Sequence, residues 1–244
     1  MIIDSLENKK IKEYLKLHHK KYRDRNKMFI VEEEHLILEA INTSSLITLI
    51  ILENTNDYNF DNVIYVSPKV MDKLSQNKSK VNCIGICKIP NVTINNYNRV
   101  VILDKIGDPA NMGAIIRNAV CFGYDQIIVS NDSVDVYNEK SIRASQGAIF
   151  KINIIRSELI DEINKLKALG FMLIGTTLTN SIEINELEVN SKMAFVFGNE
   201  GSGINGDIIK ELDINVRIPL VNFDSLNVSC ASAIVMNLYN GINV

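Results

Sequence analysis

The chain has 244 residues, of which 46% are hydrophobic and 23% charged, and its formal net charge is −3. This composition excludes a disordered chain and one coated with positive charge for nucleic acid. No apolar run approaches the roughly 20 residues that span a bilayer, the N-terminus lacks a signal-peptide pattern, and the four cysteines form no CxxC pair, so we expect a cytoplasmic protein without membrane contact or metal.

The first half of the chain predicts a small α/β unit. Apolar residues at helical spacing and short β-branched runs predict helices at 9–17, 33–41 and 68–74 and strands at 29–31, 46–52, 63–66 and 83–87. Ser67 and Pro68 suit the N-cap and first position of the third helix. The asparagine-rich stretch 90–98 has no periodicity, and we interpret it as a linker.

A basic segment lies inside this first half. Residues 9–27 hold seven lysines and two arginines against Glu13 and Asp24. A charge run of this kind is typical of a solvated helix face, and it is also a candidate for phosphate contact.

The second half predicts a parallel sheet covered on both faces, because continuous apolar strands alternate with helices. Strands are expected at 99–103, 126–130, 171–175, 193–197 and 214–218. Helices are expected at 111–122, 138–147, 157–169, 204–210 and 226–240.

The first of three polar segments follows the strand at 99–103 and opens a helix. Asn111 suits the N-cap, Gly113 allows close approach by backbone or ligand, and Arg117 is expected on the same helix face. Because the flanking residues are apolar, Arg117 suits an anion or a substrate as well as a surface ion pair.

The second polar segment, 198–203, directly follows the strand at 193–197. Ligands of open α/β sheets bind beyond the carboxyl ends of strands, and Gly198, Gly201 and Gly203 would permit close backbone approach there. The alternative is an ordinary glycine-rich turn. The run is neither a P-loop nor a dinucleotide fingerprint.

The third polar segment, 218–240, places Ser225 and Asn227 at a predicted helix start, where free N–H groups can meet a ligand. Ser225 also suits a simple N-cap. The small residues at 229–233 allow close packing of this helix. No histidine follows His35, which excludes a Ser–His or Cys–His nucleophile in this half, so the reactive group is expected from a cofactor.

In order, these segments resemble the three motifs of the SpoU (TrmH-like) branch of the SPOUT RNA methyltransferases, over residues 98–244. The matching positions are Asn111, Gly113, Arg117, Ala119, Phe122 and Gly123, then Phe197 to Gly201 with Gly203, then Ile218, Pro219 and Ser225 to Ser229. Residues 29–36 resemble the L30e-like substrate-binding domain of this family, with Glu32-Glu33 where the family usually has Glu-Gly.

The resemblance implies an α/β fold with two domains. These are an L30e-like RNA-binding domain at 1–95 and a methyltransferase domain at 98–244, whose parallel sheet would carry a deep trefoil knot. It also implies transfer of a methyl group from S-adenosylmethionine to a ribose 2'-hydroxyl of RNA, with 23S rRNA favoured, by a homodimer whose two subunits complete the site. The alternatives are a tRNA methyltransferase, an antibiotic-resistance rRNA methyltransferase and a non-catalytic RNA-binding relative.

The resemblance also implies roles for particular residues. The cofactor is expected against Thr176, Leu178, Gly198, Ile218, Leu220 and Leu226. The reaction centre is expected to contain Arg117, Asn111, Glu200, Ser225 and Asn227. Arg117 would either accept the hydroxyl proton or stay charged and stabilise the developing oxyanion. In the basic segment we expect Lys20, Lys21 and Arg23 to contact RNA phosphates.

Overall fold

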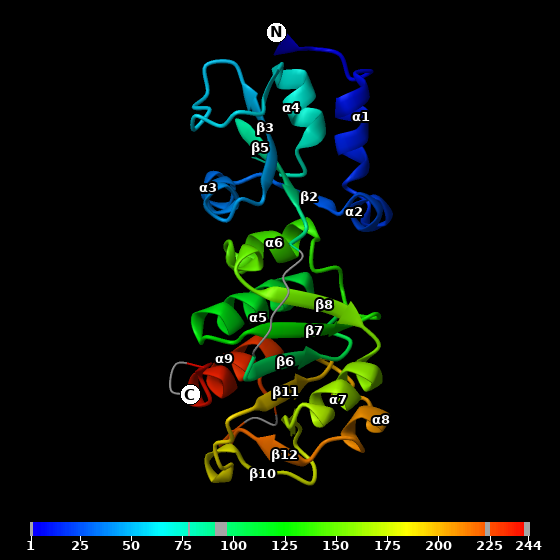
Figure 1. The fold of residues 1–244 in the computed structure, drawn as a ribbon, viewed down its shortest axis with the longest axis vertical. Helices are drawn as coiled ribbons and strands as arrows, with labels where there is room; N and C mark the ends of the chain where they lie inside the picture. The colour runs from blue at the N-terminus through cyan, green and yellow to red at the C-terminus, as the bar shows by residue number, and fades with distance from the viewer. Residues whose placement is uncertain (1, 78, 91–96, 223–224, 242–244) are drawn as a thin grey trace. The chain divides into compact units, whose positions relative to one another are not determined.

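The structure is a computed structural model that describes residues 2–77, 79–90, 97–222 and 225–241. The chain forms two compact units (Figure 1). The first unit comprises Met1–Asn91 with Tyr137–Phe150, and the second comprises Val92–Val136 with Lys151–Val244. Of the linker predicted at 90–98, residues 91–96 lie outside the described part of the chain.

The first unit is built on a mixed five-stranded sheet in the order β1-β4-β3-β5-β2. β3 pairs in parallel with β4 and antiparallel with β5. The strands are β1 (Ile2–Ile3), β2 (Met28–Val31), β3 (Leu46–Leu52), β4 (Val63–Val66) and β5 (Cys83–Lys88). The helices before β6 are α1 (Lys9–Lys16), α2 (Lys20–Asn26), α3 (Glu34–Asn42) and α4 (Pro68–Leu74).

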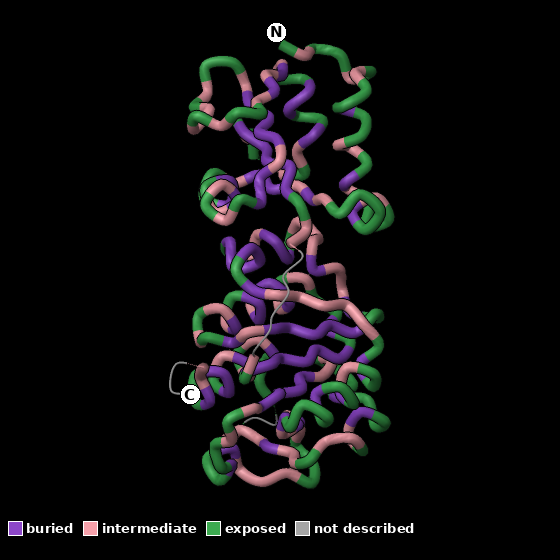
Figure 2. The backbone as a smooth tube through the Cα atoms, in the orientation of Figure 1, coloured by how far each residue is buried: buried purple, intermediate pink, exposed green. Residues whose placement is uncertain are grey.

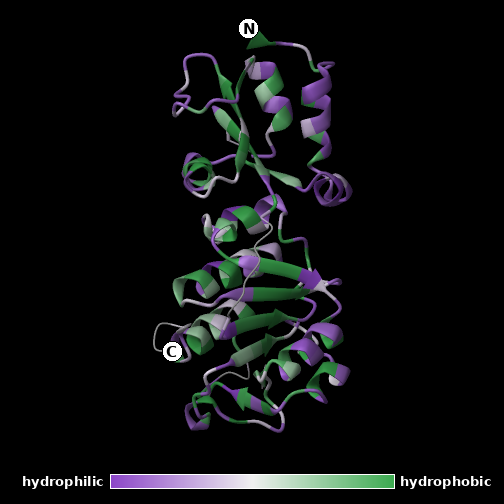
Figure 3. Cartoon of the chain, in the orientation of Figure 1, coloured by the Kyte–Doolittle hydropathy of each residue, from purple (hydrophilic) through white to green (hydrophobic). Residues whose placement is uncertain are grey.

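The predicted elements of this unit are confirmed, and two were missed. The helices expected at 9–17, 33–41 and 68–74 are α1, α3 and α4, with ends that differ by no more than a residue. α2 was missed because its sequence KKYRDRN has no apolar stripe, and Figure 3 shows it as mostly hydrophilic. β1 was missed because two residues carry no alternation.

Residues 137–150 complete the first unit, although in the sequence they fall between two strands of the second unit. They form α6 (Glu139–Ser145) and the short helix η1 (Ala148–Phe150). The fully buried ring of Phe29 lies 4.8 Å from the Tyr137 ring and 5.7 Å from the Phe150 ring, between centroids. The helix expected at 138–147 is therefore confirmed, while its packing against β2 has no signal in the local sequence.

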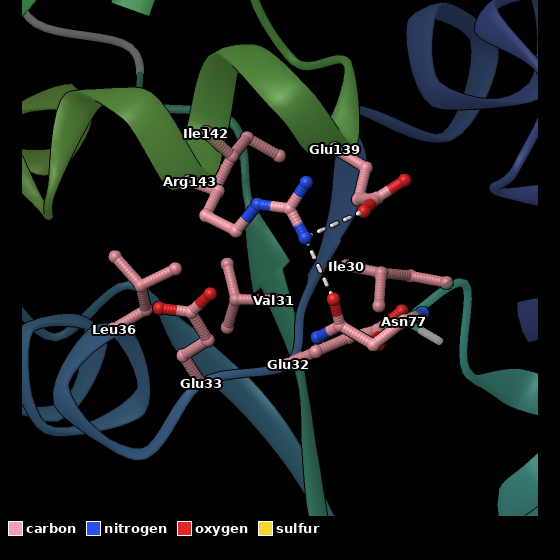
Figure 4. Close-up of a pocket in the computed structure, with 9 residues that line it drawn as sticks. All are labelled: Ile30, Val31, Glu32, Glu33, Leu36, Asn77, Glu139, Ile142 and Arg143. Atoms are coloured by element: carbon pink, nitrogen blue, oxygen red, sulfur yellow. Dashed lines mark hydrogen bonds and ion pairs between the residues drawn. The ribbon is translucent and has the colours of Figure 1, made fainter. Parts of the chain in front are cut away.

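A polar contact joins α6 to the loop after α4. Arg143 Nη1 donates to Asn77 Oδ1 at 2.7 Å and lies 3.3 Å from Glu139 Oε1 (Figure 4). The neighbouring Glu32 carboxylate is buried and accepts from Ser75 Oγ at 2.7 Å and from the Gln76 amide at 2.7 Å. Glu32 thus fixes the loop whose Asn77 accepts the hydrogen bond from Arg143.

The second unit is a parallel seven-stranded sheet in the order β10-β12-β9-β11-β6-β7-β8. The strands are β6 (Arg99–Leu103), β7 (Gln126–Ser130), β8 (Asn153–Ser157), β9 (Met172–Thr176), β10 (Ile182–Glu183), β11 (Met193–Phe197) and β12 (Ile214–Arg217). The helices are α5 (Pro109–Cys121), α7 (Leu159–Ala168), η2 (Ile184–Glu186), α8 (Gly206–Ile209) and α9 (Val228–Leu238).

The predicted parallel sheet is confirmed, and its central strands are its most buried part. Every residue of β6, β7 and β11 is buried, as the continuous apolar runs predicted (Figure 2). β8 was missed because it is half-buried along its whole length and pairs only with β7 among the described strands. This α/β fold class is confirmed, while the trefoil knot stays a prediction.

A buried arginine fixes the end of the last helix in this unit. Arg99 is 1% exposed, and its Nε donates to the Tyr239 carbonyl at 3.2 Å while Nη1 donates to the Ser191 carbonyl at 2.8 Å. Burial lowers the pKa of the Arg99 guanidinium, with Tyr124 and Asp125 acting in the opposite direction. Tyr124 also donates its hydroxyl to the Tyr239 carbonyl, at 3.2 Å. The carboxyl end of α9 is thereby tied to the start of β6.

In the described part of the chain, the helices are too short or too polar to cross a bilayer.

The assignment of 137–150 to the first unit predicts a regional effect of Phe29→Ala. Loss of a fully buried phenylalanine ring should destabilise the protein by about 3–5 kcal/mol. Hydrogen exchange in the full chain should then rise in residues 2–90 and 137–150 together, and not in β6, β7 and β11.

Phe171→Ala is the matched control, because Phe171 is 5% exposed in the core of the second unit. It should raise exchange in the second unit and leave 137–150 protected. If 137–150 follows Phe171 instead of Phe29, the assignment is wrong.

Candidate active site and cofactor pocket

The first polar segment forms the start of α5. Asp108 is the N-cap, since its side chain accepts from the Asn111 amide at 2.9 Å, and Pro109 is the first helical residue. The prediction that Asn111 caps this helix is wrong by one turn, because the Asp-Pro pair supplies both the cap and the fixed backbone angle. The Asn111 side chain is therefore available to the site.

Asn111 and Arg117 do not share a face of α5, which corrects a second expectation. At about 100° per residue, six residues place them roughly 120° apart around the helix axis. Asn111 is half-buried and contacts the other motifs, whereas Arg117 is exposed. Among the described residues, Arg117 has no hydrogen bond or ion pair.

The second polar segment closes on itself directly after β11. Asn199 and Gly203 exchange two backbone hydrogen bonds, of 3.0 Å and 2.9 Å. The Asn199 side chain accepts from the Gly201 amide at 2.9 Å and donates to the Lys105 carbonyl at 2.8 Å. A Cβ atom on Gly198 would lie 2.3 Å from the Gly203 backbone, so this glycine is required by the chain's own close approach.

Glu200 projects from this loop to the start of α5. Its carboxylate accepts from Asn111 Nδ2 at 2.9 Å and from the Gly107 and Asp108 amides at 3.3 Å and 3.4 Å. Burial acts to raise the pKa of Glu200, but the bonds from Asn111 and the backbone outweigh it and hold this pKa below its usual range. Glu200 is therefore an ionised acceptor at neutral pH.

The third polar segment meets the first through Asn227. Asn227 is the N-cap of α9, with Oδ1 accepting from the Ser229 amide at 2.8 Å, and its Nδ2 donates to Asn111 Oδ1 at 3.0 Å. The capping role considered for Ser225 belongs to Asn227, while Ser225 is exposed at the pocket. A continuous chain of hydrogen bonds, Asn227 to Asn111 to Glu200, thus joins all three motifs.

A pocket of about 650 Å³ opens beside this chain. It lies at the carboxyl ends of β9, β11 and β12 and at the start of α9. All six residues predicted for the cofactor line it, namely Thr176, Leu178, Gly198, Ile218, Leu220 and Leu226. Glu200, Ser225 and Asn227 line it as well, but Asn111 and Arg117 do not.

The pocket walls also include residues that the sequence analysis did not select. Thr177 and Thr179 extend the loop after β9, Arg217 ends β12, and Ala231 and Val235 lie one turn apart on α9. The helical spacing of Ala231 and Val235 was a usable signal for the α9 wall. The pocket volume lies in the range of small-molecule and cofactor sites, and the lining mixes apolar, hydroxyl and glycine positions.

The basic residues of the first unit divide into two groups. Lys20 and Lys21 are exposed on α2. Arg23 is 7% exposed, and its Nη1 donates to the Leu17 carbonyl at 2.7 Å. The expectation that Arg23 contacts RNA is therefore wrong, because its guanidinium stabilises the turn between α1 and α2.

No group of three or more metal-ligating side chains occurs in the described ranges. The site consists of a parallel sheet with a pocket of about 650 Å³ at its carboxyl edge and a polar chain at the pocket rim. This combination is typical of an α/β domain that binds a nucleotide-like ligand at the carboxyl ends of its strands.

Comparison with known families identifies the domain further. The model of the SpoU rRNA Methylase family matches residues 98–237, and that of the MRM3-like substrate binding domain matches residues 8–85. The chain belongs to the SpoU rRNA methylase family. The resemblance carried by the three motifs and by residues 29–36 is thus confirmed.

Similar proteins cover nearly the whole chain. The 23S rRNA (guanosine(2553)-2'-O)-methyltransferase RlmP of Bacillus subtilis (strain 168) is 29% identical over 240 residues, which are 96% of this chain and 97% of that protein. The AdoMet-bound rRNA methyltransferase from Sinorhizobium meliloti has 26% identity and a TM-score of 0.86, covering 97% and 95% of the two chains. The methyltransferase AviRb from Streptomyces viridochromogenes, in complex with AdoMet, shares the fold at 22% identity and a TM-score of 0.84, over 94% and 96%.

The lowered pKa of Glu200 predicts how Glu200→Gln depends on pH. A glutamine retains one acceptor oxygen but turns its amide toward the backbone N–H groups, so the variant should melt a few degrees lower at pH 7. A carboxylate with a depressed folded pKa contributes its stability above the unfolded value of about 4.3, and loses it as the pH falls through the folded pKa.

The difference in Tm between wild type and Glu200→Gln should therefore be full above about pH 4.3 and shrink below it. Glu188→Gln serves as control, because Glu188 is exposed and bonds to none of the described residues. A difference that is equal at pH 3 and pH 7 would contradict the assigned hydrogen bonds.

Proposed function

We propose that this chain transfers a methyl group from S-adenosylmethionine to a ribose 2'-hydroxyl of 23S rRNA. The observation that carries the proposal is the hydrogen-bond chain Asn227–Asn111–Glu200 at the rim of a pocket lined by all six residues expected for the cofactor. Membership of the SpoU rRNA methylase family and the similarity to RlmP over nearly the whole chain support the RNA substrate.

Bound S-adenosylmethionine would supply an activated methyl group, and the chain would supply orientation and charge. The Asn227 cap and the closed loop at 198–203 hold the pocket rim in one geometry, so a reactant pair placed there loses little further freedom. Glu200 is already satisfied by its donors, so its role is to position Asn111. Leu178 and Leu226 would exclude water at the pocket mouth.

Arg117 is the residue proposed to act on the ribose hydroxyl. Arginine keeps its proton in proteins, so a guanidinium beside the hydroxyl would stabilise the oxyanion that forms as the proton leaves. Because Arg117 points away from the contacts made by Asn111, we propose that it serves the pocket of a second subunit. The exposed apolar side chains Ile234 and Leu238 of α9 support a homodimer.

The first unit is proposed to bind the RNA. The proposed functional domains are 1–95 and 98–244, and residues 137–150 of the latter pack within the first unit. Lys20 and Lys21 lie on α2 near the lysines of α1, whereas α3 begins in the acidic run Glu32 to Glu34. This separation of charge supports phosphate contact through the α1 and α2 surface. A cytoplasmic location follows from the proposed ribosomal substrate.

The activity predicts methylation of 23S rRNA transcribed in vitro, which carries no modification. Purified protein with tritiated S-adenosylmethionine should label it at a ribose, found as a reverse-transcription stop at low nucleotide concentration. Arg117→Ala should lower the rate by about a hundredfold or more, as expected when a charge-stabilising group is lost, and leave calorimetric cofactor binding within twofold.

Lys140→Ala is the control, since Lys140 is exposed and outside the pocket. Labelling of tRNA in place of rRNA would show that 23S rRNA is not the substrate and would favour a tRNA methyltransferase of the same family. Absence of both cofactor binding and RNA labelling would refute it.

The proposed RNA surface predicts the salt dependence of binding. The double variant Lys20→Glu, Lys21→Glu should weaken RNA binding and reduce the slope of log K against log salt by about 1–2, because each phosphate contact releases a counterion. Filter binding at several salt concentrations measures this slope. The double reversal Lys165→Glu, Lys167→Glu on α7 is the matched control, and an unchanged slope for the α2 variant would mean that α2 is only a solvated face.

A further inference from the structure

A second polar contact joins α5 to α9, away from the pocket. Asn118 Nδ2 donates to the Ser229 carbonyl at 2.9 Å and to Ser232 Oγ at 3.0 Å. Ser232 Oγ in turn donates to the Ser229 carbonyl at 2.8 Å, and the Ser232 side chain is fully buried. The three groups form a closed triangle between the two helices.

Such a triangle of hydrogen bonds fixes the register of α5 on α9 more than it adds to the stability of the protein. Apolar side chains between two helices are attracted without regard to direction, so they permit small rotations and shifts. A buried amide and hydroxyl lose their partners if either helix slides by a fraction of a turn, and an unpaired buried polar group costs about 1–3 kcal/mol. The Asn118 contact therefore selects one position of α5 on α9.

That position is the one required at the reaction centre. Asn118 follows Asn111 by seven residues, which is close to two full turns, so both project toward α9. Asn111 contacts Asn227 at the N-cap of α9, and Asn118 contacts the next turns at Ser229 and Ser232. A rotation of α5 that broke the Asn118 contact would also separate Asn111 from Asn227.

The same rotation would redirect Arg117. Adjacent helical residues are about 100° apart, so fixing Asn118 toward α9 fixes the direction in which Arg117 leaves the helix. Because Arg117 has no hydrogen bond or ion pair among the described residues, its own side chain does not set that direction.

We propose that Asn118 is a positioning residue for the methyl transfer. Its amide holds the register of α5 on α9, and through this register it keeps Asn111 against Asn227 and directs Arg117. Asn118 does not line the pocket, so it serves the rate of transfer and not the affinity for cofactor. The inference rests on the proposed methyltransferase activity.

The principal test is Asn118→Leu, which keeps the number and branching of the side-chain heavy atoms and removes both hydrogen bonds. We expect kcat to fall by roughly ten- to a hundredfold, as small displacements of oriented groups do, with KM for RNA and calorimetric Kd for S-adenosylmethionine within about twofold. Ser232→Ala removes one bond of the triangle and should lower kcat less. The double variant should resemble Asn118→Leu alone, because the two residues act as one unit.

Tyr124→Phe is the matched control, because it removes a buried hydrogen bond to Tyr239 at the other end of α9. It should lower Tm and leave kcat unchanged. The inference is overturned if folded Asn118→Leu and Ser232→Ala keep the wild-type kcat, or if Tyr124→Phe lowers kcat as much as they do.

A second readout separates this inference from the activity itself. The side-chain amide resonances of Asn111 and Asn227 should shift in Asn118→Leu and stay in place in Tyr124→Phe. If the wild-type protein methylates no RNA, the proposed function fails, and these resonances still decide whether Asn118 sets the Asn111–Asn227 contact. Unshifted resonances in Asn118→Leu would reject the positioning role.

Discussion

The hydrogen bond from Asn227 to Asn111 is the contact on which the geometry of the pocket depends. It joins residues 116 positions apart, and Asn111 passes the constraint on to Glu200, a further 89 positions away. Asparagine suits this place because one side chain offers both an acceptor and a donor. The oxygen of Asn111 faces Asn227 and its nitrogen faces Glu200, so the amide has one orientation. A carboxylate at residue 111 would repel the carboxylate of Glu200 and could not donate a hydrogen bond to it.

The helix that begins at Asn227 is fixed at both ends, and the two ends use different chemistry. At its start, side-chain amides of α5 bind the cap and the first turns. At its end, the buried guanidinium of Arg99 and the hydroxyl of Tyr124 bind the carbonyl of Tyr239. Cationic and hydroxyl donors at a helix carboxyl end compensate carbonyl groups that lack a partner inside the helix. Both ends of α9 are therefore held by polar contacts, and residues of α9 between Val228 and Val235 line the pocket together with the closed loop at 198–203.

Sequence patterns predicted the features that depend on local periodicity or on short motifs. The buried strands β6, β7 and β11 were evident from continuous apolar runs, and the three polar segments are joined by hydrogen bonds beside the pocket. The exact cap of α5 was missed because Asp108 and Asn111 are both good N-cap residues, and the signal of Pro109 at the first helical position was not used. Arg23 was misjudged because a charge run does not reveal which of its members turns inward to a carbonyl.

The remaining differences are long-range. Helix α2 has no apolar stripe because most of its residues face solvent, so periodicity could not detect it. The relation of Asn111 to Arg117 follows from helix geometry and was available, but the motif spacing obscured it. The packing of Tyr137 and Phe150 on Phe29 depends on residues more than a hundred positions apart, and no local pattern carries that information.

The membership of residues 137–150 in the first unit bears on how proteins of this architecture can be inherited and rebuilt. A gene segment that encodes residues 1–91 alone would lack the aromatic partners of Phe29. Exchange of the substrate-binding half between relatives by a single crossover would therefore pair Phe29 with a foreign helix. Residues 1–91 and 137–150 are therefore expected to change together in evolution. A designed chimera has to transfer both stretches of sequence.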